Sequence, residues 1–106
     1  MSPASAGPGA GGASPARGAL RRRVTIVNRR GLHARAAARF VRVAEQFHAE
    51  IAVAKDDLTV CGTSIMGLMT LAAAQGSTLE IRTRGREARP ALAALVALIE
   101  SGFDED

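Results

Sequence analysis

The feature that most limits this chain is a change in sequence character near residue 22. Residues 1–20 read MSPASAGPGAGGASPARGAL, a run of glycine, proline and small residues with almost nothing to bury. Beyond it, apolar side chains recur at regular spacings. We therefore expect a disordered tail over residues 1–21 and one folded domain over residues 22–106. About 80 patterned residues can fold alone but leave no room for a second domain.

The apolar spacings predict four strands and three helices. Period-two alternation, typical of strands, occurs in residues 22–27, 50–55, 58–61 and 77–84. Helical spacing occurs in residues 34–47, 64–73 and 87–100. A mainly antiparallel four-stranded sheet with the helices on one face would bury every apolar stripe, which predicts an α+β fold of order βαββαβα. The chain has no Trp, no Tyr and only three Phe, so the core must be aliphatic.

The net charge of +4 comes entirely from the first 23 residues, which overlap the start of the predicted domain. Residues 1–23 carry four arginines and no acidic residue, so residues 24–106 sum to zero. RNA-binding sheets also need exposed aromatic residues, which the strands lack, and we expect no nucleic-acid partner. Charge is nevertheless uneven, which favours an acidic partner surface at one place. The basic cluster is Arg29, Arg30, Arg35, Arg39 and Arg42, and the acidic end is Asp104, Glu105 and Asp106.

Location and cofactors follow from what the sequence contains. No apolar run approaches the ~18–20 residues of a membrane helix, so no membrane insertion is expected. The single cysteine, Cys61, fits a reducing compartment and predicts a cytoplasmic protein. We find no spacing of His, Cys, Asp or Glu that would predict a metal site, and we expect no cofactor.

The segment from Gly31 to Arg35 could carry chemistry. A helix beginning just after His33 would leave its first backbone N–H groups without acceptors, and its dipole would favour a neutral imidazole. A neutral imidazole can attack a phosphoryl group, whose oxygens the N–H groups and the Arg35 guanidinium could bind. On these grounds alone, the favoured interpretation is that His33 caps the helix and Arg35 is a solvated side chain.

This segment and a second stretch of the sequence resemble two motifs of a known protein family. Residues 31–41 read GLHARAAARFV and follow VTI at residues 24–26, and residues 64–73 read SIMGLMTLAA. The first stretch resembles the active-site region of the HPr family, the histidine-containing phosphocarriers of the phosphoenolpyruvate-dependent phosphotransferase system. The second is similar to the helix of that family that begins at a regulatory serine. The resemblance covers roughly residues 22–101 and implies an open-faced β-sandwich.

The resemblance implies a role for particular residues. His33 would accept a phosphoryl group on Nδ1 from phosphorylated enzyme I and pass it to an enzyme IIA domain, with Arg35 supporting the phosphate. Such a protein is a carrier and not an enzyme, and we expect a monomer that presents one face to successive partners. The family usually has Pro where this chain has Ala36, which weakly favours a nitrogen-related rather than a sugar-transport branch.

Ser64 and its neighbours have two interpretations each. Ser64 is suited to cap the following helix, and the resemblance adds phosphorylation by an HPr kinase/phosphorylase. Ile65 would lie on a core-facing stripe with Leu68 and Ala72. Met66 and Met69 would then lie partly outside, where adaptable side chains suit docking to several partners. We predict a partner-docking surface made by Ile65, Met66, Met69 and Arg39.

A different class of function also fits the strand order. Small ligand-binding regulatory domains of ferredoxin-like topology begin βαββαβ as well. The additional final helix and the placement of His33 and Arg35 favour the phosphocarrier.

Overall fold

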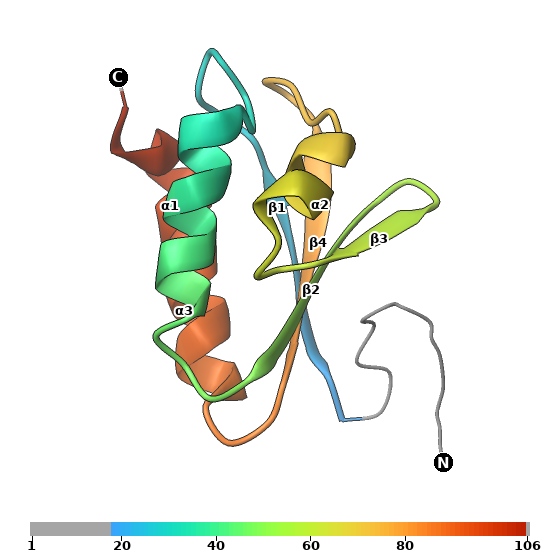
Figure 1. Ribbon diagram of the computed structural model, residues 1–106, viewed down its shortest axis with the longest axis vertical. Coiled ribbons are helices and arrows are strands. Elements are labelled where there is room, and N and C mark those ends of the chain that lie inside the picture. Colours follow the sequence, from blue (N-terminus) through green and yellow to red (C-terminus); the bar gives the residue numbers. More distant parts are fainter. Residues whose placement is uncertain (1–17, 106) are drawn as a thin grey trace.

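The structure, a computed structural model, describes residues 18–105. A four-stranded sheet lies behind three helices (Figure 1). All three strand pairs are antiparallel, in the order β1-β4-β2-β3. The predicted α+β fold of order βαββαβα is therefore confirmed. The elements are β1 (Leu20–Thr25), α1 (Ala34–Ala44), β2 (Glu50–Lys55), β3 (Leu58–Cys61), α2 (Ile65–Thr70), β4 (Thr78–Arg84), α3 (Ala88–Glu100) and a short 3₁₀ turn, η2 (Gly102–Asp104).

β4 carries the alternation that the sequence predicts, whereas residues 51–54 of β2, the other central strand, are all buried. In β4, Leu79, Ile81 and Thr83 are buried, and in β2 the side chains of Ile51 and Val53 are buried beside them. The Thr83 hydroxyl is fully buried and donates a 2.8 Å hydrogen bond to the carbonyl of Ala88. This bond satisfies the one polar side chain of the inner face of β4 and fixes the start of α3 against the sheet.

The first strand begins earlier than its alternation predicts. β1 starts at Leu20, inside the expected tail, and pairs with β4 from Leu20 opposite Thr83 to Thr25 opposite Thr78. Three exposed arginines follow Leu20 and hide the alternation there. The rest of the expected tail, residues 1–17, lies outside the described residues.

The helices are amphipathic as predicted, but two of them are shorter. α1 ends at Ala44 and not at residue 47, because the amides of Gln46 and Phe47 bond three residues back and tighten the last turn. α2 ends at Thr70, and Ala72 has a φ of 51° that no helix continues through. Within residues 18–105, no helix is both long and apolar enough to span a membrane.

The end of α2 corrects one expectation about its buried face. Ile65 is 39% exposed and Ala72 is exposed as well, so neither contributes to the core. Leu68 is buried as predicted, and Leu71, just after the helix, is buried as well. The helix ends before Ala72, so the predicted stripe does not extend to that residue.

The core is aliphatic apart from Phe40 and Phe103, each at most 1% exposed. α3 packs on β1 and β4 and also contacts α1. Its buried stripe is the predicted one, with Leu92, Leu95, Val96 and Ile99, extended by Ala88 and Ala91. This packing of α3 over the sheet is the feature that a ferredoxin-like βαββαβ domain would lack.

Ala72 offers a test of how the chain leaves α2. A left-handed conformation costs a residue other than glycine about 1–2 kcal/mol, whereas glycine loses roughly 0.5–1 kcal/mol more entropy on folding. We expect Ala72→Gly to raise the free energy of unfolding by about 0.5–1 kcal/mol, measured by urea denaturation. The control is Ala74→Gly, which is exposed but is not in the left-handed region and should gain nothing. Equal effects at both positions would contradict the assignment of strain to Ala72.

Candidate functional site

His33 lies at the start of α1, as the sequence predicts. It is the N-cap residue, with an extended backbone (φ −78°, ψ 178°), and its carbonyl accepts the 2.8 Å hydrogen bond from the Ala37 amide. The amides before Ala37 therefore have no acceptor within the helix. The imidazole makes no capping hydrogen bond to these amides. Thus the ring lies near the helix start, and neither of its nitrogens is occupied by a capping hydrogen bond.

A carboxylate holds the imidazole from one side. The Nε2 atom of His33 lies 2.5 Å from Oε2 of Glu105, and the two side chains are 15% and 12% exposed. The hydrogen bond uses Nε2, and Nδ1 is the other ring nitrogen, separated from it by one carbon. The contact therefore fixes the direction in which Nδ1 points.

Asn28 holds the other oxygen of the same carboxylate. Its Nδ2 donates to Oε1 of Glu105 at 3.0 Å and to the carbonyl of Gly31 at 2.9 Å. Asn28 is only 4% exposed, and its Oδ1 is buried without a hydrogen-bond partner among the described residues. Two acceptors therefore set the orientation of the Asn28 amide. In this orientation its Oδ1 makes no hydrogen bond to the described residues. A buried acceptor without a partner costs about 1–3 kcal/mol.

The chain end reaches the site through a left-handed turn. Gly102, Phe103 and Asp104 have φ values of 72°, 58° and 60°. This conformation costs about 1–2 kcal/mol for each residue other than glycine. Complete burial of the Phe103 side chain, which is 0% exposed, contributes about 1.5–3 kcal/mol in return. The Arg39 guanidinium also donates to the Phe103 carbonyl. Figure 1 shows the result, with the C-terminal segment beside the first turn of α1.

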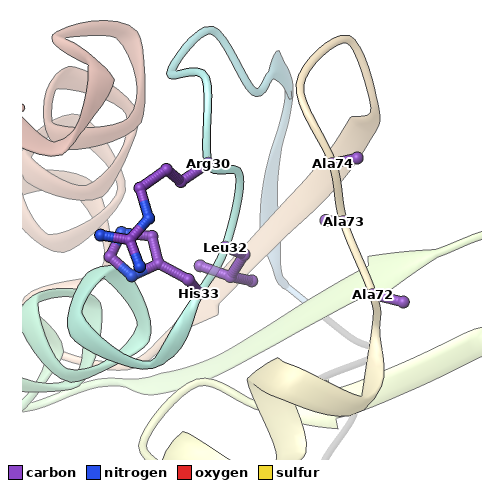
Figure 2. Close-up of a pocket in the computed structure, with 6 residues that line it drawn as sticks. All are labelled: Arg30, Leu32, His33, Ala72, Ala73 and Ala74. Atoms are coloured by element: carbon purple, nitrogen blue, oxygen red, sulfur yellow. The ribbon is translucent and has the colours of Figure 1, made fainter. Parts of the chain in front are cut away.

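A pocket opens beside the ring. It has a volume of about 230 Å³ and lies between the loop before α1 and the loop after α2 (Figure 2). The Arg30 side chain extends toward His33 in this view. The lining residues are Arg30, Leu32, His33, Ala72, Ala73 and Ala74. Arg30 and His33 therefore line the same pocket.

Backbone contacts fix the two loops around the pocket. The Leu32 amide donates to the Ala73 carbonyl at 2.9 Å. Gly31 allows this approach, because a Cβ atom there would lie 2.4 Å from the same carbonyl oxygen, and its φ is 68°. The loop therefore requires glycine immediately before Leu32 and His33.

The other predicted site residues have different surroundings. Arg35 and the two methionines are exposed, with Met66 at 74% and Met69 at 41%. Ser64 caps α2, because its Oγ accepts the Gly67 amide at 2.9 Å. Arg39 is partly buried and holds the C-terminal turn. No group of three or more potential metal ligands occurs within residues 18–105.

Sequence reasoning missed Glu105, Asn28 and Arg30 as parts of this site. The available signal was the contrast between an acidic chain end and an arginine-rich segment around α1. That contrast was interpreted as a surface for a partner, whereas Glu105 meets His33 within the chain. A hydrogen bond across 72 residues leaves no local pattern.

This arrangement defines a class of protein. An antiparallel sheet under three helices, with a partly exposed histidine at the start of the first helix, is the arrangement expected of a histidine-containing phosphocarrier. The family model described as "PTS HPr component phosphorylation site" matches residues 20–101. The chain belongs to the HPr family, and it is a phosphocarrier of the phosphotransferase system.

Individual relatives agree with this assignment. The phosphocarrier protein HPr of Neisseria meningitidis serogroup A is 46% identical over 86 residues, covering 81% of this chain and 97% of that protein. The phosphocarrier protein NPr of Shewanella violacea is 40% identical over 86 residues, covering 81% of this chain and 94% of that protein.

Solved structures show the same fold. HPr-C-His from Thermoanaerobacter tengcongensis has a TM-score of 0.79 at 42% identity, covering 82% of this chain and 98% of that one. A structure of an HPr dimer from the same organism has a TM-score of 0.66 at 45% identity, covering 77% and 94%. The sheet topology and the similar solved structures therefore both confirm the predicted open-faced sandwich.

The Glu105 contact predicts a dependence of stability on pH. The hydrogen bond with His33, reinforced by that from Asn28, lowers the pKa of Glu105 from its ordinary value of 4.5. A carboxyl whose pKa is lowered by folding stabilises the protein above that ordinary value, and this contribution is lost as the pH falls through the lowered pKa. The nearby Arg30 charge acts in the same direction.

We therefore expect Glu105→Gln to destabilise the protein near neutral pH and to have little effect in acid. Urea unfolding at a series of pH values, for wild type and variant, measures the difference. That difference should shrink as the pH falls below 4.5. Asp104→Asn removes the same charge from an exposed neighbour and is the control. A difference that is constant across the acid range would show that the Glu105 carboxylate is not ionically engaged.

Proposed function

We propose that His33 accepts a phosphoryl group on Nδ1 from phosphorylated enzyme I and delivers it to a histidine of an enzyme IIA domain. One observation supports this most strongly. His33 is the N-cap of α1, yet its ring caps no amide of that helix and makes its hydrogen bond through Nε2. Nδ1 is left for the incoming group. The 15% exposure of the side chain suits a nucleophile that must meet a partner at the surface.

The charges around His33 suit a transient phosphoryl group. Arg30 lines the pocket beside the ring, and Arg35 is exposed in the first turn of α1. A planar guanidinium can bind two phosphate oxygens at once. The unpaired amides of the first turn of α1 add donors and the positive end of the helix dipole. Their role is to offset the negative charge that arrives with the phosphoryl group.

The docking surface that we propose is apolar and lies on α2. It consists of Ile65, Met66 and Met69, which are 39%, 74% and 41% exposed. Flexible methionine side chains adapt to differently shaped partners, as a carrier with a donor and an acceptor requires. Arg39 was predicted to join this surface, but its guanidinium is bonded to the Phe103 carbonyl, so any contact with a partner would be made by a side chain already held.

Ser64 is the proposed regulatory site, phosphorylated by an HPr kinase/phosphorylase. Its hydroxyl oxygen accepts the Gly67 amide, and its side chain is partly exposed. A phosphate there would bring roughly −1.5 to −2 charges to the edge of the docking surface. Partners attracted by the arginines are expected to be acidic, so this charge should weaken their binding.

Three further properties belong to the same proposal. The protein is a covalent intermediate without turnover of its own, and therefore not an enzyme. It acts as a monomer, because one exposed face must serve two partners in turn. Its single cysteine fits the reducing environment of the cytoplasm. The sugar-transport and nitrogen-related branches both fit, since relatives named HPr and NPr are similar over comparable lengths.

The acceptor is tested by a label from phosphoenolpyruvate. Wild-type protein incubated with enzyme I and labelled phosphoenolpyruvate should gain an acid-labile phosphate, and His33→Ala should gain none. His48→Ala is the matched control, because His48 is the other histidine and is exposed. It should be labelled like wild type. Label that survives in His33→Ala, or that is absent from wild type while a known carrier is labelled in the same mixture, would refute the assignment.

The regulatory site is tested with ATP and an HPr kinase/phosphorylase. Wild type should gain an acid-stable phosphate that Ser64→Ala does not gain. Since Ser64→Ala also loses the cap of α2, its free energy of unfolding should fall by about 1 kcal/mol. Ser77→Ala controls for another serine with a backbone contact. No label on wild type, with a working substrate beside it, would mean that Ser64 is a cap alone.

A further inference from the structure

The contact between His33 and Glu105 joins the second-to-last residue of the chain to the start of the first helix. The two atoms involved are Nε2 and Oε2, at 2.5 Å. A carboxylate can only accept a hydrogen bond, so Nε2 must carry the proton. In a neutral imidazole the other nitrogen then has its lone pair free. The contact therefore selects one tautomer, the one in which Nδ1 is the nucleophile.

The chain around Glu105 is built to hold this contact. The turn before it is left-handed at three consecutive residues, of which Phe103 and Asp104 are not glycine. Such a conformation persists only where the surroundings impose it. Here Phe103 is fully buried and its carbonyl is bound by Arg39 of α1. The turn thus connects α1, which carries His33, to the residue that meets His33.

Asn28 fixes the carboxylate from the other side. Both hydrogens of its amide are used, one on Glu105 and one on the Gly31 carbonyl. Reversing the amide would place its oxygen against two acceptors. Although its Oδ1 is left buried without a partner among the described residues, this orientation is the one that serves Glu105. The carboxylate is therefore oriented at both oxygens.

We propose that Glu105 is a positioning residue for phosphoryl transfer, which holds the proton on Nε2 of His33 and directs the Nδ1 lone pair outward. The proposal rests on His33 being the phosphoryl acceptor. Glu105 lies outside both the active-site motif and the regulatory-serine motif, so the proposal gives a role to a residue near the chain end that neither motif includes.

The chemical step shows what the carboxylate does. The Nδ1 lone pair forms a bond to phosphorus, and the bond from phosphorus to the histidine of enzyme I breaks, with its electron pair returning to that histidine. The Nε2 proton stays in place, so the His33 ring gains a positive charge. Glu105 faces this charge at hydrogen-bond distance. When the phosphoryl group moves on to the next histidine, the protonated ring leaves as a neutral imidazole.

The groups that face Glu105 are His33, Asn28 and the Arg30 charge. The Nε2 proton of His33, which faces Glu105, is the one whose position the proposal concerns. Nitrogen NMR of the histidine ring reports directly which nitrogen carries it.

The first experiment measures the tautomer in the unphosphorylated full-length protein. With ¹⁵N-labelled histidine at a pH where the ring is neutral, wild type should show His33 protonated on Nε2. Glu105→Ala should shift a measurable fraction to the Nδ1-protonated form, and Asp104→Asn should match wild type. His48 is an internal reference that should not change. An Nδ1-protonated ring in wild type, or the same tautomer ratio in Glu105→Ala, would overturn the proposal.

The second experiment measures the rate of phosphoryl transfer from phosphorylated enzyme I. Glu105→Gln keeps an oxygen that can accept the Nε2 proton but lacks the charge, whereas Glu105→Ala lacks both. We expect both to be slowed, Glu105→Ala by roughly tenfold or more, the size of effect seen when a carboxylate that orients a metal-binding histidine is removed. Asp104→Asn should transfer at the wild-type rate. Unchanged rates in both Glu105 variants would overturn the proposal.

The two proposals fail in different ways. If His33 is not the acceptor, His33→Ala remains labelled by enzyme I, whatever the tautomer measurement gives. If Glu105 does not position the ring, wild type is labelled on His33 but its tautomer and its rate do not depend on Glu105. Far-ultraviolet circular dichroism of each variant checks that the fold is intact.

Discussion

The burial of Phe103 against the rest of the core is the constraint on which the site depends. With no Trp or Tyr in the chain, the core contains two fully buried aromatic rings, Phe40 and Phe103. Phe103 lies in the short turn after α3. Because its side chain is buried, the chain end lies against α1. The left-handed turn and the Arg39 contact follow from that anchor. Without it, nothing would bring a carboxylate to the imidazole of His33.

The sheet contributes to the site through position and not through side chains. β1 leads into the loop before α1, and the segment after α2 lies beside that loop. The bond between the Leu32 amide and the Ala73 carbonyl joins the two segments at the pocket. Strand pairing therefore fixes the loops, the loops fix the helix start, and the helix start fixes the histidine. Charge is then added by arginines from the loop and from α1.

The sequence predicted what is periodic and what is local. The strands, the helices and the buried stripe of α3 were all visible as spacing, and His33 could be placed at a helix start from the residues around it. Helix ends were less predictable, because α1 tightens and α2 stops for reasons that lie in backbone hydrogen bonding. The start of β1 was hidden by three arginines whose polarity outweighs a strand pattern. In each case the boundary depends on backbone hydrogen bonds or strand pairing, which the local amino-acid composition does not reveal.

The part of the site that the sequence could not reveal is the part made by distant residues. Asn28 and Arg30 come from the loop before α1, and Glu105 reaches this loop from the chain end, next to the buried Phe103. Opposite charges in two segments of a sequence indicate attraction, but they do not say whether the partner is another protein or the same chain. Here Glu105 is used internally, while Arg35 stays exposed. This division suits the proposed carrier role, in which the Glu105 carboxylate would stay bound to His33 while Arg35 met each new partner.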